Sequence, residues 1–493
     1  MDNKLKKNII YNALYQALVI LLPILTMPYL VRTLSKEQIG INSYSLSVVQ
    51  IFIVISFWGI NNYASREIAS QKDNGKMNEE FWSLWTIQII FTIFSFVTLN
   101  LFNIYFFKDN KIIFFIQSFL VLINMIEVSW FFIGIEELKL VVVRNTVIKL
   151  LMTSSIFIFI KDTNDFYLYI LINVITSLVG NIVLVNSLKQ YVSTPNVNKE
   201  RVRYHLSKSW KFLIPQFSIL IYTSLDKVIL GNLANMTEVA YYDQSQKIIR
   251  IAVSLVSSVG VALLPRMTYL AQNNKKEEFD NLLTKSLNNV LLVSIYIVTV
   301  IICVSPNFVD WFFSKEYRNM ALLMQIVSPI GVFIPIATIL WNTVLIPNKL
   351  DNIAIKSAIY CAIMSVILNT LLDKNLGALG AIITLLIVEF YGMSYRIYHS
   401  RKYYNFKILI PSLCKYLGAG IFSYICVILF TGFMKSSIIS TVIIGIISTI
   451  VYFLILIAMK DKLLLSYLEK VKMRLKRGDT KQAVIVLLYW LFI

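Results

Sequence analysis

Charged residues are scarce in this chain. Only 15% of its 493 residues are Asp, Glu, Lys or Arg, whereas soluble domains carry about 25%. Hydrophobic residues make up 57% of the chain, and the mean hydropathy is +0.69. The composition excludes an ordinary soluble globular protein and predicts an all-α integral membrane protein.

Cysteine and histidine are also rare, with four and two residues. No CxxC pair is present, which argues against a zinc site or a disulfide framework. Both histidines lie in basic segments that flank apolar runs, and no GxxxxGK[ST] nucleotide motif occurs. We therefore expect no metal, no cofactor and no catalytic residues, and a protein that is not an enzyme.

Apolar runs long enough to cross a bilayer recur along the whole chain. A spanning helix needs about 20 apolar residues, and about fourteen such helices are predicted. Prolines in the first and the tenth predicted spans make these two the best candidates for kinked helices. The spans are 9–32, 42–62, 82–107, 112–135, 141–160, 166–188, 211–231, 239–264, 285–305, 320–346, 352–373, 377–398, 408–433 and 437–459.

Basic residues outnumber acidic ones by 46 to 27, and their positions alternate. They cluster at the N-terminus, in the loops that follow even-numbered spans and in the C-terminal tail. Cytoplasmic loops are enriched in Lys and Arg, so both termini are predicted to be cytoplasmic. The net charge of +19 is therefore a topology signal, and no nucleic-acid partner is expected.

The longest polar connection falls near the middle of the chain and predicts two pseudo-symmetric lobes around a central cavity. Shifting the chain by about 200 positions places the helix–turn–helix pattern of 12–66 on that of 212–266, although the identities are near chance. Parallel internal repeats of this kind are common in transporters. The predicted divisions are an N-terminal lobe at 1–190, a linker at 191–210, a C-terminal lobe at 211–400, two additional spans at 401–460 and an amphipathic cytoplasmic tail at 461–493.

Ionisable side chains inside spans are the candidate functional residues, because each costs roughly 2.5–3.5 kcal/mol to insert. Glu127 and Glu389 are candidates for coupling to H⁺ or Na⁺, and a buried pair with a lysine is the alternative. The aromatic run at 130–132 is expected to face lipid or the interface. Candidates for lining the cavity are Arg32, Asn124, Gln216, Asp226, Lys227, Lys247 and Arg250.

Simpler roles stay open for several of these candidates. Arg32 ends its span, so anchoring at the interface explains it as well as cargo contact does. Asp226 and Lys227 fit a structural ion pair as well as a cavity. Lys247 and Arg250 are three residues apart and share a face. Lys247 is too deep in its helix to reach the interface easily, which favours the cavity.

Two stretches of the chain have recognisable patterns. They are Leu34-Ser35-Lys36-Glu37-Gln38-Ile39-Gly40 with Arg66-Glu67-Ile68-Ala69, and Asp226-Lys227 with Glu238-Val239-Ala240-Tyr241-Tyr242. They resemble the polysaccharide flippases of the MOP superfamily, the Wzx-like branch related to MATE exporters and the lipid II flippase. The resemblance implies twelve or fourteen helices in two lobes around a cavity. It also implies transfer of undecaprenyl-diphosphate-linked oligosaccharide repeat units from the inner to the outer leaflet of the bacterial cytoplasmic membrane, for capsule, exopolysaccharide or O-antigen assembly. The pathway polymerase and glycosyltransferases would be partners.

Three other classes stay open at this stage. A lipid II- or teichoic-type flippase would share the fold and the lipid-diphosphate cargo. A MATE-like exporter of small cations would need a net acidic cavity, whereas the candidates here are mostly basic. A membrane glycan polymerase would carry a large extracytoplasmic loop, and all the predicted loops are short.

Overall fold

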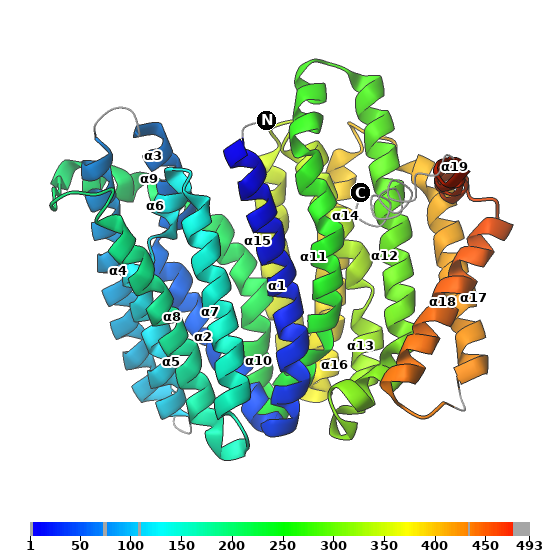
Figure 1. The fold of residues 1–493 in the computed structure, drawn as a ribbon, viewed down its shortest axis with the longest axis horizontal. Helices are drawn as coiled ribbons and strands as arrows, with labels where there is room; N and C mark the ends of the chain where they lie inside the picture. The colour runs from blue at the N-terminus through cyan, green and yellow to red at the C-terminus, as the bar shows by residue number, and fades with distance from the viewer. Residues whose placement is uncertain (1–2, 72–75, 107–109, 432–433, 477–493) are drawn as a thin grey trace. The chain divides into compact units, whose positions relative to one another are not determined.

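The computed structural model describes residues 3–71, 76–106, 110–431 and 434–476, and over these ranges the chain is built of helices and connecting turns (Figure 1). It forms two compact units, Met1–Ala240 and Tyr241–Ile493. The boundary between the units lies beyond 211, where we placed the start of the C-terminal lobe. The predicted domain limits and the two-lobe arrangement stay predictions.

The first unit contains ten helices in its described residues. Two pairs of helices that are close in sequence pack on each other, α4 with α5 and α7 with α8, and α5 also packs on α8 (Figure 1). The helices are α1 (Asn3–Thr33), α2 (Lys36–Phe57), α3 (Ile60–Gln71), α4 (Met77–Phe106), α5 (Lys111–Ile123), α6 (Ser129–Gly134), α7 (Leu138–Phe159), α8 (Phe166–Leu188), α9 (Lys199–Leu220) and α10 (Asp226–Leu233).

Helix α11 (Met236–Gln272) begins in the first unit, and most of it belongs to the second unit. Its α12 packs on α14, α17 and α18, and α15 packs on α16. The remaining helices are α12 (Lys276–Phe312), α13 (Met320–Val327), α14 (Ile330–Leu340), α15 (Asp351–Leu376), α16 (Ala378–Ser400), α17 (Ile410–Thr431), α18 (Ile438–Ala458) and α19 (Lys462–Lys476).

Within the described residues, twelve helical segments are long and apolar enough to cross a membrane. They coincide with twelve of the fourteen predicted spans, which confirms the all-α, multi-span class. The other two predicted spans, 9–32 and 211–231, are helical in α1 and in α9–α10 but are not among the twelve. The count of fourteen therefore stays a prediction.

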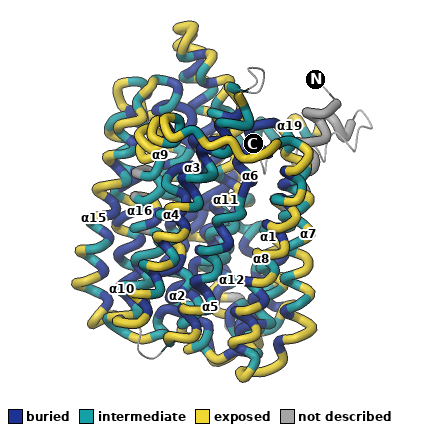
Figure 2. The backbone as a smooth tube through the Cα atoms, turned by 90° about the vertical axis from the view of Figure 1, so that its left-hand side faces the viewer, coloured by how far each residue is buried: buried dark blue, intermediate teal, exposed yellow. Residues whose placement is uncertain are grey.

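Large apolar side chains are exposed along the outer turns of many of these helices, and Figure 2 shows exposed residues on α4, α7 and α15. Leu371 and Leu429, for example, are 63% and 71% exposed. In water such surfaces would favour aggregation, but in a bilayer they meet acyl chains. This pattern is the one expected of helices that face lipid on one side.

The aromatic run at 130–132 is a correction to the sequence analysis. Trp130, Phe131 and Phe132 are at most 1% exposed and pack in the core of the first unit with Phe81. The prediction of a lipid-facing belt is wrong, because the chain is not a single straight span here. A break in the helix turns these rings inward.

Three predicted segments differ in detail from the structure. The predicted linker at 191–210 is helical from Lys199 onward, and α9 packs against α2, α3 and α4. The span at 320–346 is interrupted between α13 and α14 and ends in the π-helical turn Trp341–Leu345. Of the predicted tail, α19 is helical, and the rest, from 477, lies outside the described residues.

Candidate functional site

Lys247 and Arg250 of α11 interact with polar side chains of their own helix. Lys247 Nζ lies 2.8 Å from Asp243 Oδ2, four residues earlier. Arg250 Nε donates to Gln246 Oε1 at 2.6 Å with the same spacing. Residues four apart share a helix face, so α11 presents one polar stripe, in which the Lys247 side chain is 39% exposed and Asp243 only 8%. The predicted shared face of Lys247 and Arg250 is present.

A second polar group of the same unit lies on α16. Glu389 interacts electrostatically with Arg250 of α11 and with Arg396 of its own helix. The Arg396 Nη1 donates to the Ala337 carbonyl of α14 at 2.9 Å, and its buried Nε has no hydrogen-bond partner in the described residues. One carboxylate thus lies within electrostatic reach of two guanidinium groups, and these three residues together carry one positive charge in excess.

Close helix packing holds the α11 stripe in place. A methyl group added at Gly331 of α14 would come within 2.8 Å of the Ile249 side chain, and one at Gly260 would come within 3.1 Å of Ile339 Cα. Glycine at these points lets α11 and α14 approach each other directly. Glycine at these two points therefore brings α11, which carries Arg250, close to α14.

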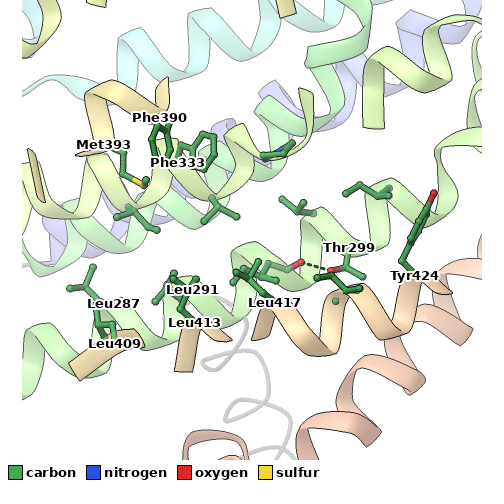
Figure 3. A pocket seen from close by; sticks show the side chains of 18 of the residues that line it. Leu287, Leu291, Thr299, Phe333, Phe390, Met393, Leu409, Leu413, Leu417 and Tyr424 are labelled. Carbon is green, nitrogen blue, oxygen red and sulfur yellow. Dashed lines mark hydrogen bonds between the residues drawn. The ribbon is translucent and has the colours of Figure 1, made fainter. Parts of the chain in front are cut away.

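An apolar cavity of about 880 Å³ lies among α12, α13, α14, α16 and α17 of the second unit. Figure 3 shows Phe333, Phe390 and Met393 facing Leu413 and Leu417 across it. The few polar groups on its wall are bonded elsewhere: the Thr299 hydroxyl donates to Ile295 and the Gln325 amide to Ile302. The cavity suits a hydrocarbon ligand, because no buried polar group in its wall needs a hydrogen-bond partner from the ligand.

The first unit carries a break in a membrane helix. α5 ends at Ile123, residues Asn124–Ile126 form one 3₁₀ turn, and Glu127 is extended with φ −83° and ψ 103° before α6 begins. Glu127 Oε1 accepts from Arg144 Nη2 at 3.0 Å and Glu127 also bonds the Ser129 hydroxyl and backbone N–H. The predicted intramembrane carboxylate is therefore one half of a buried ion pair, with arginine in place of the lysine we considered.

Arg144 was missed as a site residue because it lies only three residues after the predicted start of its span at 141. We therefore counted it with the basic residues of the preceding cytoplasmic loop. Helix α7 begins at Leu138, so Arg144 lies roughly 9 Å inside at 1.5 Å per residue. Its side chain is 13% exposed and also donates to Asn181 of α8 at 3.0 Å. A span start three residues earlier would have flagged it as an intramembrane cation.

Side chains of neighbouring helices satisfy the carbonyl groups that the break leaves free. The Gln88 amide of α4 donates to the carbonyls of Asn124 and Glu127 and accepts from Trp130 Nε1. The Asn124 side chain donates to Ser56 of α2 at 3.2 Å. Non-helical backbone at membrane depth survives only with such partners. Asn124 is thus a structural member of the break in this structure.

The other predicted cavity residues lie on α1, α9 and α10 of the first unit. Arg32 is exposed in the last turn of α1, where a cation complements the helix dipole. Asp226 is 3% exposed and follows the π-helical turn Ile221–Leu225. Lys227 is half-buried in α10, and Gln216 is half-buried in α9. Because the candidates belong to two units, their membership in one cavity stays a prediction.

A third buried cluster joins α3, α4 and α9 in the first unit. His205 Nε2 bonds the Glu80 carboxylate, and Tyr63 Oη lies 2.9 Å from His205 Nδ1. Arg201 Nη2 lies 3.3 Å from the other Glu80 oxygen. Burial lowers the pKa of His205, opposed by the Glu80 carboxylate. The sequence showed only a histidine in a basic segment, and tertiary packing makes it a core residue.

In the part of the chain that the structure describes, no group of three His, Cys, Asp or Glu side chains is placed to hold a metal ion.

The fold is shared with membrane transporters of known structure. A lipid II flippase in an inward closed conformation matches with a TM-score of 0.69 at 14% identity, covering 92% of this chain and 99% of that one. An inward-facing multidrug-resistance MATE transporter of the MOP superfamily matches with a TM-score of 0.59 at 12% identity, covering 78% of this chain and 97% of that one. The chain thus shares its fold with these two proteins.

The family is shown by sequence as well. The family model described as polysaccharide biosynthesis protein matches residues 5–271, and this chain belongs to that family. A relative named "Putative O-antigen transporter" from Escherichia coli (strain K12) is 25% identical over 390 residues, covering 78% of this chain and 94% of the relative. A relative of the same name from Shigella dysenteriae is 23% identical over 389 residues, covering 78% and 97%. These matches confirm the resemblance found in the sequence.

Proposed function

We propose that this protein is a flippase that moves an undecaprenyl-diphosphate-linked oligosaccharide from the inner to the outer leaflet of the bacterial cytoplasmic membrane. The relatives named for O-antigen transport and the fold of a lipid II flippase support this function. These relatives carry the names of transporters, which agrees with the expectation that the protein is not an enzyme. The predicted cytoplasmic position of both termini belongs to the same proposal.

One observation in the second unit carries the proposal: α16 places charged and apolar side chains next to each other. Glu389 and Arg396 are seven residues apart, two helical turns, and form the charged cluster with Arg250. Phe390 and Met393 of the same helix line the apolar cavity. A lipid diphosphate is amphiphilic in the same way, with an anionic head and a hydrocarbon tail.

The cations supply what the cargo head group needs. A diphosphate carries about two negative charges, and guanidinium groups bind phosphate oxygens through paired N–H donors. Arg250 and Arg396 have a single carboxylate, Glu389, within electrostatic reach, so an anion could compensate the remaining positive charge. Lys247, whose side chain is 39% exposed and paired with Asp243, lies on the same stripe of α11. The predicted roles of Lys247 and Arg250 belong to this proposal.

The apolar cavity supplies a place for part of the lipid tail. Its volume of about 880 Å³ and its Leu, Ile and Phe lining match a segment of isoprenoid chain, whose burial is favourable by roughly 25 cal/mol per Å². A lipid II- or teichoic-type flippase is the second candidate, since its cargo shares the lipid diphosphate and one matched structure is a lipid II flippase. Coupling to H⁺ or Na⁺ at Glu127 or Glu389 completes the proposal.

The deciding experiment locates the lipid-linked oligosaccharide in a deletion strain. We expect it to accumulate in the cytoplasmic leaflet and to reach the outer leaflet when the gene is restored. Mass spectrometry of the trapped lipid then identifies the sugar and separates the two cargo candidates. Single unpolymerised units in the outer leaflet of the deletion strain would assign the protein to a step after flipping, and the polymerase alternative would replace the flippase.

Substitutions test the cation cluster. Arg250→Ala and Arg396→Ala should abolish surface polysaccharide while the amount of protein in the membrane is unchanged. Lys247→Arg should retain more activity than Lys247→Glu, because the sign of the charge is the claimed requirement. Lys356→Ala, which removes an exposed cation of α15, is the matched control. Normal polysaccharide in both arginine variants would contradict the assignment.

Filling the cavity tests the tail site. Leu291→Trp and Leu413→Trp place an indole in the cavity from α12 and from α17, and either should lower flipping severalfold at an unchanged protein level. Leu429→Trp adds the same bulk at a position that is 71% exposed, and should leave flipping unchanged. Equal flipping in all three variants would exclude the cavity from cargo binding.

A further inference from the structure

The first half of α9 is fixed to the start of α4, at the end of the first unit where Figure 1 shows α3, α6 and α9. His205 bonds the Glu80 carboxylate in the first turn of α4, and Arg201 lies 3.3 Å from the same carboxylate. The chain before α9 is held there too, because Trp82 Nε1 donates to the Ser193 carbonyl at 3.1 Å. Helix α4 is long and apolar enough to span the membrane from Met77 onward. The first half of α9 therefore lies at the level where that span begins.

Large aromatic and apolar side chains of α9 lie outside this contact. Tyr204 and Trp210 are 46% and 44% exposed and Leu206 is 36% exposed, whereas His205 between them is fully buried. Tryptophan and tyrosine are enriched at both membrane–water interfaces, because each ring has an apolar body and a polar tip. Exposed rings at the end of a membrane span are therefore placed as interface anchors are.

Basic side chains surround these rings. The helix from 199 to 211 carries five basic residues and one acidic residue. Lys208 Nζ lies 5.6 Å from the centre of the Tyr204 ring, so cation and ring belong to one surface. Arg201 turns inward to Glu80, and the other four basic residues are exposed: Lys199, Arg203, Lys208 and Lys211.

Tertiary packing adds a further cation from another helix. Arg66 of α3 is exposed, and its Cζ lies 5.4 Å from the centre of the Phe212 ring of α9. The positive surface is thus larger than the charge run in α9 alone.

The chemistry of this surface favours lipid over a protein partner. Lysine is depleted at the centres of protein–protein interfaces, yet three of the four exposed cations of α9 are lysines. Anionic leaflets attract basic segments that lie next to a membrane span. Amphipathic helices that bind in the interface plane combine lysine and arginine with tryptophan, phenylalanine or leucine. Both features meet on α9.

We propose that residues 199–211 of α9 form an interfacial helix that binds the head groups of anionic phospholipids. Its exposed rings enter the head-group region, and its exposed cations meet the lipid phosphates. Because His205 and Arg201 tie α9 to Glu80 of α4, bound lipid holds this end of the first unit at the membrane surface. The inference does not depend on the cargo of the transporter.

The first test measures the binding of phosphatidylglycerol to the purified full-length protein in detergent micelles by native mass spectrometry, with phosphatidylcholine as the neutral comparison. Arg203→Gln/Lys208→Gln/Lys211→Gln should bind phosphatidylglycerol at least about fivefold more weakly than wild type and phosphatidylcholine equally well. The matched control removes three exposed cations of the second unit and should bind both lipids as wild type does; it is Lys315→Gln/Arg318→Gln/Lys374→Gln. Equal affinities of the two triple variants for phosphatidylglycerol would overturn the proposal.

The second test uses Trp210 and needs no change of charge. The fluorescence that Trp210→Phe removes is the contribution of Trp210. In nanodiscs of phosphatidylglycerol brominated near the head group, most of this contribution should be quenched relative to unbrominated lipid. An unquenched Trp210 would place the surface away from the bilayer and assign it to a protein partner, which also overturns the proposal. High salt should bring wild type and the α9 triple variant together, because salt screens exposed charges, and a difference unchanged by salt would contradict the electrostatic origin.

Discussion

The Glu127–Arg144 pair makes a quantitative prediction for stability. Removing one partner of a buried ion pair leaves the other charge uncompensated, at about 3–5 kcal/mol. Arg144→Gln removes the donors to Glu127, Ser129 and Asn181, at 3.0, 2.6 and 3.0 Å. Both side chains are less than a fifth exposed, so solvent screens the loss little. We expect Arg144→Gln to lower the free energy of unfolding by about 3–5 kcal/mol.

The double variant Glu127→Gln/Arg144→Gln should be more stable than Arg144→Gln alone. It no longer carries a buried carboxylate without a counter-charge, and contacting residues typically show coupling energies of about 0.5–3 kcal/mol. Reversible unfolding in detergent micelles, followed by tryptophan fluorescence, measures all four proteins of the cycle. Lys139→Gln, at an exposed position near the start of the same helix, should change stability by less than about 0.5 kcal/mol.

A double variant no more stable than Arg144→Gln would refute this reasoning. It would mean that the hydrogen bonds of Arg144 to Ser129 and Asn181 carry the whole effect and that Glu127 is solvated in the native state.

Three more predictions address packing and pH. Gly40→Ala should prevent accumulation of folded protein, because the added Cβ would lie 1.7 Å from the Met236 carbonyl oxygen. Gly418→Ala, whose added Cβ would have no neighbouring atom within 4 Å, is the control. Equal yields of the two variants would contradict the packing of α2. Trp130→Ala should cost about 3–5 kcal/mol because the ring is 1% exposed; a variant as stable as wild type would restore the lipid-facing interpretation. The pKa of His205 is lowered from 6.5 by burial, so the unfolded chain binds the proton more readily than the folded protein. The free energy of unfolding should therefore fall as pH drops below about 6.5, by at most ~1.4 kcal/mol per pH unit. His205→Gln should flatten this pH dependence in denaturant titrations, and an unchanged slope would show that another group titrates.

Much of the fold was predictable because spanning helices are a local property of sequence. A bilayer demands about 20 apolar residues and internally satisfied backbone groups, and twelve of the fourteen predicted segments meet those conditions in the structure. Prolines also predicted the irregular span at 320–346, where α13, α14 and the π-helical turn replace one helix. No comparable signal predicted the break at Asn124–Val128. It lacks proline, and its stability depends on Gln88 from another helix.

The candidate residues were predictable as types and not as pairs. An intramembrane Glu127 is costly wherever it occurs, so its presence alone marked it. Its partner Arg144 lies on another helix, and nothing in the spacing of the two indicates that they meet. Arg396 could have been found as the residue two helical turns from Glu389. Only the tertiary structure shows its hydrogen bond to α14 and places Arg250 of α11 within electrostatic reach of the same Glu389.

The sequence by itself determined that this protein is an all-helical membrane protein and placed costly charges within its spans, because hydropathy and insertion energy depend on each segment alone. Only the tertiary structure decided which charges are neutralised, which aromatic rings are buried and where an apolar cavity remains. Those outcomes depend on how helices far apart in the chain pack together. The same lysine, arginine or glutamate is a snorkelling anchor, half of an ion pair or a binding group according to what its neighbours place beside it.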